Sequence, residues 1–175
     1  MASTYAVKFL PMDKVPQAFP VMQNLVGLSL DRWQRYARSR VEAHNSLPGS
    51  AGIVAIENQQ GYIHGLFGYR VDLDLRCGRV LLCEYLVALG LFDAEAVLDV
   101  LVEAMESLAR NKHCGAIHVR VPQPPVQANE HADGRLMETL RGSGHAVETL
   151  ELCRPLAPPD EQVAAVSARE EGDDR

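Results

Sequence analysis

Residues 94–110 place their apolar side chains three and four positions apart, with acidic residues between them. This spacing has the period of an α-helix with one buried side, and Gly115 is expected to end the helix. The buried side is expected to hold Val97, Leu101, Ala104, Met105 and Leu108, and the outer side Glu95, Asp99, Glu103, Glu106 and Arg110. A helix with so wide an apolar side is stable only against another apolar layer, which the rest of the chain must supply.

The segments before this helix have the pattern of β-strands. A first run covers residues 4–11, and three more follow in series, separated by polar turns, at residues 51–57, 62–75 and 80–88. In the third run, apolar residues from Ile63 to Leu75 share one parity and polar residues such as Arg70 and Asp72 share the other, so one face is expected to be buried. The short turns predict an antiparallel meander.

Helices and two further strands complete the expected order. One helix follows Asp13, and a second begins at the N-cap Ser29 and carries Trp33, Ala37 and Val41 on one side. After the long helix, the pattern predicts a strand, a short helix and a last strand at residues 116–122, 135–144 and 146–156.

Composition limits the domain organisation and the class of partner. The chain has 175 residues, 47% of them hydrophobic, which suits one domain with its own core. We expect a domain at residues 1–157 and an acidic, disordered tail at residues 158–175. The tail holds six acids and two arginines, so it carries −4 of the net charge of −6 and leaves the domain close to neutral. A nucleic-acid partner is therefore not expected, because phosphate neutralisation needs a basic excess.

Two further classes are not expected. No apolar run approaches the ~18 residues of a membrane span, and the first residues do not resemble a signal peptide, so we expect a cytoplasmic protein without a membrane partner. The four cysteines, Cys77, Cys83, Cys114 and Cys153, are widely spaced and are expected to be buried free thiols. His113, His118 and Cys114 lie close in sequence, but no further ligands accompany them, so no metal site is expected.

The order of elements is similar to that of the GNAT superfamily of acyl-CoA-dependent N-acyltransferases. LVEAMESLARNKHCGAIHVRV resembles the family's central helix and following strand, and LRGSGHAVETLEL resembles its short helix, glycine and final strand. The resemblance covers residues 4–157. It implies an α/β (α+β) fold, with a mixed, mostly antiparallel sheet of six or seven strands, a central helix and flanking helices. It also implies acetyl-CoA or another acyl-CoA as donor, a small-molecule or peptide amine as acceptor, and a homodimer.

The donor site of that family is where this chain departs most from it. In the family, a bulged strand leads into an R-x-x-G-x-G/A loop whose backbone N–H groups hold the CoA pyrophosphate at the helix N-terminus. Here Asp93, Ala96 and Leu98 take the three motif positions. Asp93 is a good N-cap and Glu95 lies in the first turn, so the protein's own carboxylates would compete with phosphate for these amides.

Two interpretations of this departure stay open: a well-capped structural helix, or a donor site formed by a variant loop. If the site is retained, the resemblance assigns cofactor binding to residues of the strand end and first helical turn, namely Leu89, Leu91, Asp93, Ala94, Ala96 and Val97.

Glu84 is the candidate catalytic residue, because it is the one charged residue in the run VLLCEYLVA. A carboxylate in an apolar strand needs a partner, water or a shifted pKa. The resemblance implies that it acts as base toward the acceptor amine, and the alternative is an ion pair with Arg70 or His64. The family's usual acid, a tyrosine on the short helix, is replaced here by Leu140, which leaves Cys83, Tyr85 or a water as substitutes.

A basic surface is expected on the second helix, which carries Arg32, Arg35, Arg38 and Arg40. The default interpretation is a solvated face, but guanidinium groups would also attract an acidic substrate. We assign substrate binding to Arg32, Arg35 and Arg70. His145 is expected to be a packed or surface histidine.

Three hypotheses of function follow. The first is an N-acyltransferase that transfers an acyl group, most simply acetyl, to an amine, with Glu84 as base. The second is a catalytically inactive GNAT-fold binding or regulatory protein with a degenerate donor site. The third is a GNAT-like domain that binds another ligand in the same cleft.

Overall fold

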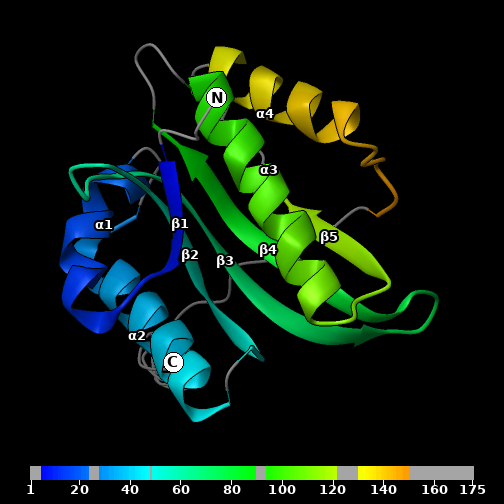
Figure 1. Cartoon of the computed structure of the whole chain (residues 1–175), viewed down its shortest axis with the longest axis horizontal. Helices are drawn as coiled ribbons and strands as arrows, with labels where there is room; N and C mark the ends of the chain where they lie inside the picture. The colour runs from blue at the N-terminus through cyan, green and yellow to red at the C-terminus, as the bar shows by residue number, and fades with distance from the viewer. Residues whose placement is uncertain (1–4, 24–27, 48, 90–93, 122–129, 150–175) are drawn as a thin grey trace, which may run out of the picture. The chain divides into compact units, whose positions relative to one another are not determined.

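The computed structural model describes residues 5–23, 28–47, 49–89, 94–121 and 130–149 (Figure 1). Five strands lie within them: β1 (Tyr5–Phe9), β2 (Ala51–Asn58), β3 (Ile63–Asp74), β4 (Gly78–Ala88) and β5 (Ala116–Arg120). The helices are a 3-10 turn η1 (Met12–Lys14), then α1 (Val15–Met22), α2 (Leu30–Ser46), α3 (Ala94–Asn111) and α4 (Glu130–Gly142).

The strands form one sheet in the order β1-β2-β3-β4-β5. The first three pairings are antiparallel and follow from the short turns, whereas β5 runs parallel to β4 because α3 crosses over between them. The mixed, mostly antiparallel sheet is therefore confirmed, with five strands among the described residues where six or seven were expected. Of the last predicted strand, residues 146–149 are not in a strand, and residues 150–156 lie outside the described residues.

Helices cover both faces of the sheet. Val54 and Ile56 of β2 pack in the cluster formed with α3 and α4, and Ile53 and Ala55 pack in the cluster formed with α1 and α2. Figure 1 shows α3 lying across the sheet and α1 and α2 gathered beside β1 and β2. Gly65 of β3 allows α3 to come close, because a Cβ there would lie 2.8 Å from the Val97 side chain.

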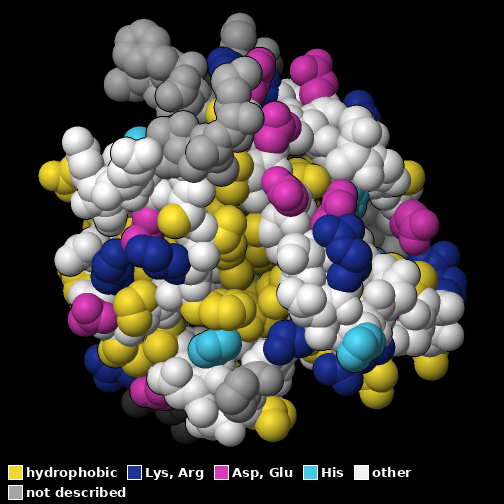
Figure 2. Space-filling view, in the orientation of Figure 1, with side chains coloured by type: hydrophobic (Ala, Val, Ile, Leu, Met, Phe, Trp, Pro, Cys, Tyr) yellow, Lys and Arg dark blue, Asp and Glu magenta, His cyan; other side chains and the backbone are white. Residues whose placement is uncertain are grey.

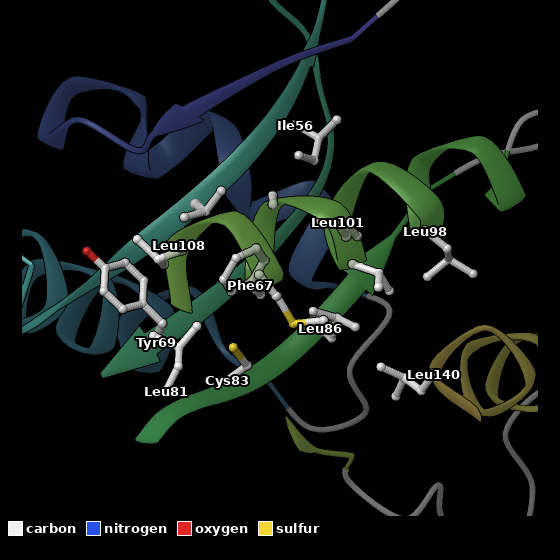
Figure 3. Close-up of a cluster of buried hydrophobic side chains, with 14 of the residues drawn as sticks. Ile56, Phe67, Tyr69, Leu81, Cys83, Leu86, Leu98, Leu101, Leu108 and Leu140 are labelled. Atoms are coloured by element: carbon white, nitrogen blue, oxygen red, sulfur yellow. The ribbon is translucent and has the colours of Figure 1, made fainter. Parts of the chain in front are cut away.

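The expected buried side of α3 is confirmed, and its residues form the centre of the first cluster (Figure 3). Figure 2 shows acidic side chains along the outward side of the same helix, where Glu95, Asp99 and Glu103 are exposed. The helix ends differently from the expectation. His113 adopts the left-handed conformation, with φ 53°, and the Cys114 amide donates to the Ala109 carbonyl. Gly115 instead permits close packing, because a Cβ there would lie 2.9 Å from the Cys77 carbonyl oxygen.

The prediction for the middle strand of the meander is correct only in part. Phe67 and Tyr69 are buried as expected, but Leu66 of the opposite parity is buried too, because helices cover both faces. At the far end, Leu73 and Leu75 are 84% and 106% exposed, since the hairpin of β3 and β4 extends beyond the helices. The expected loop at residues 44–50 is shorter than predicted, because α2 continues to Ser46.

The residues up to His145 form one compact unit, and residues 146–175 are assigned to a second. Three cysteines are described, all free: Cys83 is buried as expected, whereas Cys77 and Cys114 are only half-buried. Among the described helices, none has the length and apolar character needed to cross a membrane. The boundary expected at residue 157 lies outside the described residues.

Candidate active site

The candidate site is built around a bulge in β4. Pairing with β3 is regular from Gly78 to Glu84, which lies opposite Gly68, and the register then shifts. Tyr85 is the inserted residue and has φ 55°, in the left-handed region. The bulge changes the parity of the strand: Cys83 and Leu86 both pack in the cluster with α3 (Figure 3). As a result, Glu84 and Tyr85 both contact the same residue of α2, Tyr36.

Glu84 is buried, with 6% of its surface exposed, and it lies among basic and hydroxyl groups. The Tyr36 hydroxyl donates to its Oε1 at 3.0 Å, and Arg40 forms an ion pair with the same oxygen. From β5, which lies on the other side of β4, Nη1 of Arg120 is 3.7 Å from Oε2. One carboxylate therefore meets two guanidinium groups.

Local geometry explains why Tyr36 and Arg40 reach Glu84 together. They are one helical turn apart on α2, so they share a face, and the guanidinium carbon of Arg40 lies 5.2 Å from the centre of the Tyr36 ring. Gly68 provides the space for the hydroxyl, because a Cβ there would lie 1.9 Å from it. The rings of Tyr36 and Tyr85 also meet in an edge-to-face arrangement, with 5.1 Å between ring centres.

The electrostatics keep both α2 residues protonated. Burial, followed by the negative charge of Glu84, raises the pKa of Tyr36 well above its ordinary value. For Arg40, burial acts to lower the pKa, but the contacts with Tyr36 and Glu84 outweigh it and raise the pKa. At neutral pH, Tyr36 is thus a neutral hydrogen-bond donor and Arg40 a cation.

The expected partners of Glu84 are wrong. Arg70 lies opposite Leu82 and pairs at 3.3 Å with Asp72, two residues away on its own strand. His64 meets the ring of Tyr5, with 5.5 Å between ring centres. Because α2 crosses beside the bulge, Arg40 reaches Glu84 from a segment distant in sequence, and local pattern did not indicate this.

The structure does not bring together the assigned substrate-binding residues. Arg32 and Arg35 are exposed on α2, and Arg35 pairs with Asp31 one turn earlier. Arg70 is half-buried and occupied by Asp72. The role of these three arginines in substrate binding stays a prediction. Of the arginines on α2, Arg40 is the one that reaches the bulge, where it pairs with Glu84.

The candidate acid residues fall in different environments. Cys83 is fully buried in the α3 cluster, and burial raises the pKa of its thiol, so it is a protonated core residue. Leu140 packs in the same cluster. Tyr85 is 39% exposed beside Glu84. His145 is half-buried and its Nδ1 lies 3.0 Å from the Ser143 hydroxyl, which agrees with the expected packed histidine.

The expected donor site is described only in part. Leu91 and Asp93 lie outside the described residues, so the proposed Asp93 cap stays a prediction. Leu89 is half-buried and its amide donates to the His64 carbonyl. Ala94 begins α3, the Ala96 side chain is exposed, and the Val97 side chain is fully buried against the sheet.

The residues present at the start of α3 fit a phosphate-bearing donor. The amides of the first helical turn have no acceptor within a helix. Ala96 is small and exposed, and Leu98, at the second glycine position of the family motif, points into the core and not toward the helix end. Only the exposed Glu95 adds unfavourable charge there among the described residues.

Three residues of the site were not predicted from the sequence: Tyr36, Arg120 and Gly68. A glycine inside a strand pattern is one signal of a close approach that could have been used. A second buried acid, Glu57, was also missed. It pairs with Lys8 at 2.8 Å and with Lys14 at 2.5 Å, next to an irregularity in the pairing of β2 with β3.

The chain resembles known proteins in structure but not in sequence. No family model matches the chain, and no curated protein matches its sequence. Among solved structures, an aminoglycoside N-acetyltransferase, AAC(6')-Iy, in complex with CoA covers 90% of this chain and 98% of its own, at TM-score 0.68 and 13% identity.

Two further solved structures give the same result. AAC(6')-Ih from Acinetobacter baumannii covers 88% of this chain and 99% of its own, at TM-score 0.66 and 9% identity. Glucosamine-6-phosphate N-acetyltransferase from Arabidopsis thaliana covers 88% and 99%, at TM-score 0.59 and 14% identity.

Proposed function

The chain has the GNAT fold, and on that premise we propose that it is an N-acyltransferase that moves an acyl group, most simply acetyl, from acyl-CoA to an amine. The observation that carries the proposal is the bulge at Tyr85, where β4 loses its regular pairing a few residues before α3 begins. A bulge leaves backbone groups without a ladder partner, which gives hydrogen-bond donors to a carbonyl oxygen that becomes negative during attack.

The donor would bind between this bulge and the first turn of α3. We propose residues 89–97 as the donor site. Leu91, Asp93, Ala94, Ala96 and Val97 would contribute backbone amides that attract pyrophosphate, and Leu89, whose amide already donates to the His64 carbonyl, would border the site. When bound, acyl-CoA supplies the thioester that the amine attacks. The similar AAC(6')-Iy structures, one with CoA and one with a bisubstrate analogue containing CoA, support a donor of this kind.

The acceptor would approach from the side of α2, where the exposed Tyr85 and the Tyr36 ring border the bulge. We propose a small-molecule or peptide amine. With both substrates bound, the protein would contribute mainly by placing the amine nitrogen near the thioester carbon. Fixing the two reactants in attack geometry removes much of the entropic barrier.

The test is titration calorimetry of the full chain with acetyl-CoA and, separately, with CoA, followed by detection of free CoA thiol after an amine is added. We expect saturable binding of both nucleotides and amine-dependent release of thiol. If no heat is seen even at millimolar acetyl-CoA, the donor site is absent, and the GNAT-fold binding protein without catalysis replaces the proposal.

A further inference from the structure

We infer that Glu84 is the centre of an ion-pair clamp that holds α2 and β5 at the bulge, and that the acceptor amine must therefore arrive there without its extra proton. The clamp stands on geometry alone, whereas the statement about the acceptor rests on the proposed function. Glu84 is thus assigned as a positioning residue, in place of the base that the family resemblance implied.

The first support is the way the carboxylate oxygens are occupied. Oε1 accepts from the Tyr36 hydroxyl at 3.0 Å and from the Arg40 guanidinium, and Oε2 faces Arg120 at 3.7 Å. The Arg40 side chain is itself only 19% exposed. If Glu84 took a proton from an ammonium group, Arg40 would be left as a largely buried cation without its counterion, which is strongly unfavourable.

The second support is that the other groups around Glu84 do not offer a base. On α2, Tyr36 has a raised pKa, because of burial and the Glu84 charge, and is a neutral phenol at ordinary pH. On β3, Arg70 pairs with Asp72. On β4, the Cys83 thiol lies in the α3 cluster.

The remaining neighbour is β5, which contributes Arg120 and, two residues earlier, His118. His118 lies opposite Leu82, two positions from the Glu84–Arg120 pair along β4 and β5. Within the described residues, the groups that contact the Glu84 carboxylate are therefore two cations, Arg40 and Arg120, and the Tyr36 phenol.

This arrangement selects a chemical class of acceptor. An alkylamine such as a lysine side chain, with a pKa of about 10.4, is almost entirely ammonium at neutral pH, whereas an α-amino group, at about 7.7–8.0, is partly neutral. The acceptor class is therefore a weakly basic amine. Its neutral nitrogen attacks the thioester carbon, the C–N bond forms, the C–S bond breaks, and the released proton ends on the CoA thiolate through solvent.

The kinetic test uses the full chain, acetyl-CoA and three amines of rising basicity: aniline, glycinamide and n-butylamine. We expect kcat/KM to rise with pH along each amine's own titration, and Glu84→Gln to lower the rate by one common factor for all three. A base at Glu84 predicts instead that Glu84→Gln slows n-butylamine most, by about 10²- to 10⁴-fold, and aniline least. That result, or a pH profile with one enzyme pKa shared by all amines, would overturn the inference.

The clamp is tested separately by a double-mutant cycle in urea unfolding, with Arg40→Gln, Glu84→Gln and both together. We expect the two changes to be non-additive by at least tenfold in the folding equilibrium constant. The exposed pair Arg35–Asp31, 73% exposed on both sides, is the matched control and should be close to additive. If Arg40→Gln fails to fold, Tyr36→Phe replaces it in the cycle as a milder change that also removes one contact with Glu84.

The two arms separate the possible failures. Additive effects at Arg40 and Glu84 would overturn the clamp whether or not CoA binds. Loss of all CoA binding and transfer, with the coupling intact, would overturn the proposed function and the acceptor class but leave the clamp. Transfer that depends on Glu84 for basic amines would keep the proposed function and overturn the inference.

Discussion

At the scale of single residues, Gly68 decides whether Glu84 can be held as it is. It lies opposite Glu84 on β3, and the Tyr36 hydroxyl occupies the place where a side chain would begin. Its backbone does not require the left-handed region, so the requirement is for space alone. A glycine inside a strand weakens the strand and often marks a place where another group comes close. Replacing Gly68 therefore tests whether the Tyr36 hydroxyl needs this space.

Gly68→Ala is expected to destabilise the fold by roughly 1–3 kcal/mol, because the new methyl group displaces the Tyr36 hydroxyl from Glu84. Urea unfolding measures the change. In a Tyr36→Phe background the loss of stability should be smaller. The hydroxyl oxygen, 1.9 Å from the added Cβ, is then absent, and the next atom of the ring lies 3.1 Å from that Cβ.

Gly134→Ala is the control for this prediction. Gly134 lies inside α4 with nothing within 4 Å of an added Cβ, so alanine there should stabilise by about 1 kcal/mol. Equal effects of Gly68→Ala with and without the Tyr36 hydroxyl would contradict the proposed contact.

At the scale of elements, α3 has to pack against the sheet and, under the proposed function, also to bind an anion at its N-terminus. Its inner side packs on the sheet through residues such as Val97 and Leu101, while its first turn has to stay open to an anion if the proposed function holds. Its C-terminus closes through His113 in the left-handed conformation, which a helix end tolerates. The acidic outer side reaches the first turn at Glu95, where negative charge also stabilises the helix dipole.

Glu95→Gln is therefore expected to tighten acetyl-CoA binding by about two- to fivefold at low salt, because it removes one like charge near the pyrophosphate. Titration calorimetry at two salt concentrations measures this, and the gain should fall as salt rises. Glu103→Gln, on the same exposed side two turns further along, is the control and should leave affinity unchanged. Equal gains from both variants would place the anion elsewhere.

At the scale of the whole molecule, two buried acids of the described residues, Glu84 and Glu57, form ion pairs between different elements. Each lies beside an irregularity in strand pairing. Glu84 joins β4 to α2 and β5 through arginines. Glu57, 1% exposed, joins β2 to β1 and η1 through Lys8 and Lys14. Both pairs connect segments that are far apart in sequence, so their free energy contributes to the tertiary fold and not to any single element.

The Glu57 pair makes global stability depend on pH. Burial acts to raise the pKa of Glu57, but Lys14 and Lys8 outweigh it and lower the pKa. A carboxylate with a lowered pKa stabilises the fold above its unfolded-state pKa of about 4.3, and this contribution is lost as pH falls through the folded-state value.

Urea unfolding of the wild type and Glu57→Gln is expected to show the larger difference in free energy at pH 7 and a smaller one at pH 3. Glu103→Gln, an exposed acid, serves as the reference and should give a small difference at both pH values. A Glu57→Gln difference that does not change with pH would show that the lysines do not stabilise the ionised form.

How far the site could be predicted varies from residue to residue. Glu84 was identifiable because a lone charge in an apolar strand needs a partner, water or a shifted pKa, and the structure shows it buried with charged partners. Its partners were not, since Arg40 is 44 positions earlier and four arginines of one helix look alike in sequence. The strand pattern also failed at Leu75, because alternation indicates a face but not how far the covering helices extend.

The sequence by itself determined the order of the elements from β1 to α4, including the buried side of α3, the cap of α2 at Ser29 and the meander of β2 to β4. These follow from side-chain periodicity and turn residues, which act over a few positions of chain. Only the tertiary structure decided that β4 carries its inserted residue at Tyr85, that Gly68 makes room for Tyr36, and that Glu84 is shared by Arg40 and Arg120. Such contacts depend on how layers pack, and packing joins residues that no local pattern connects.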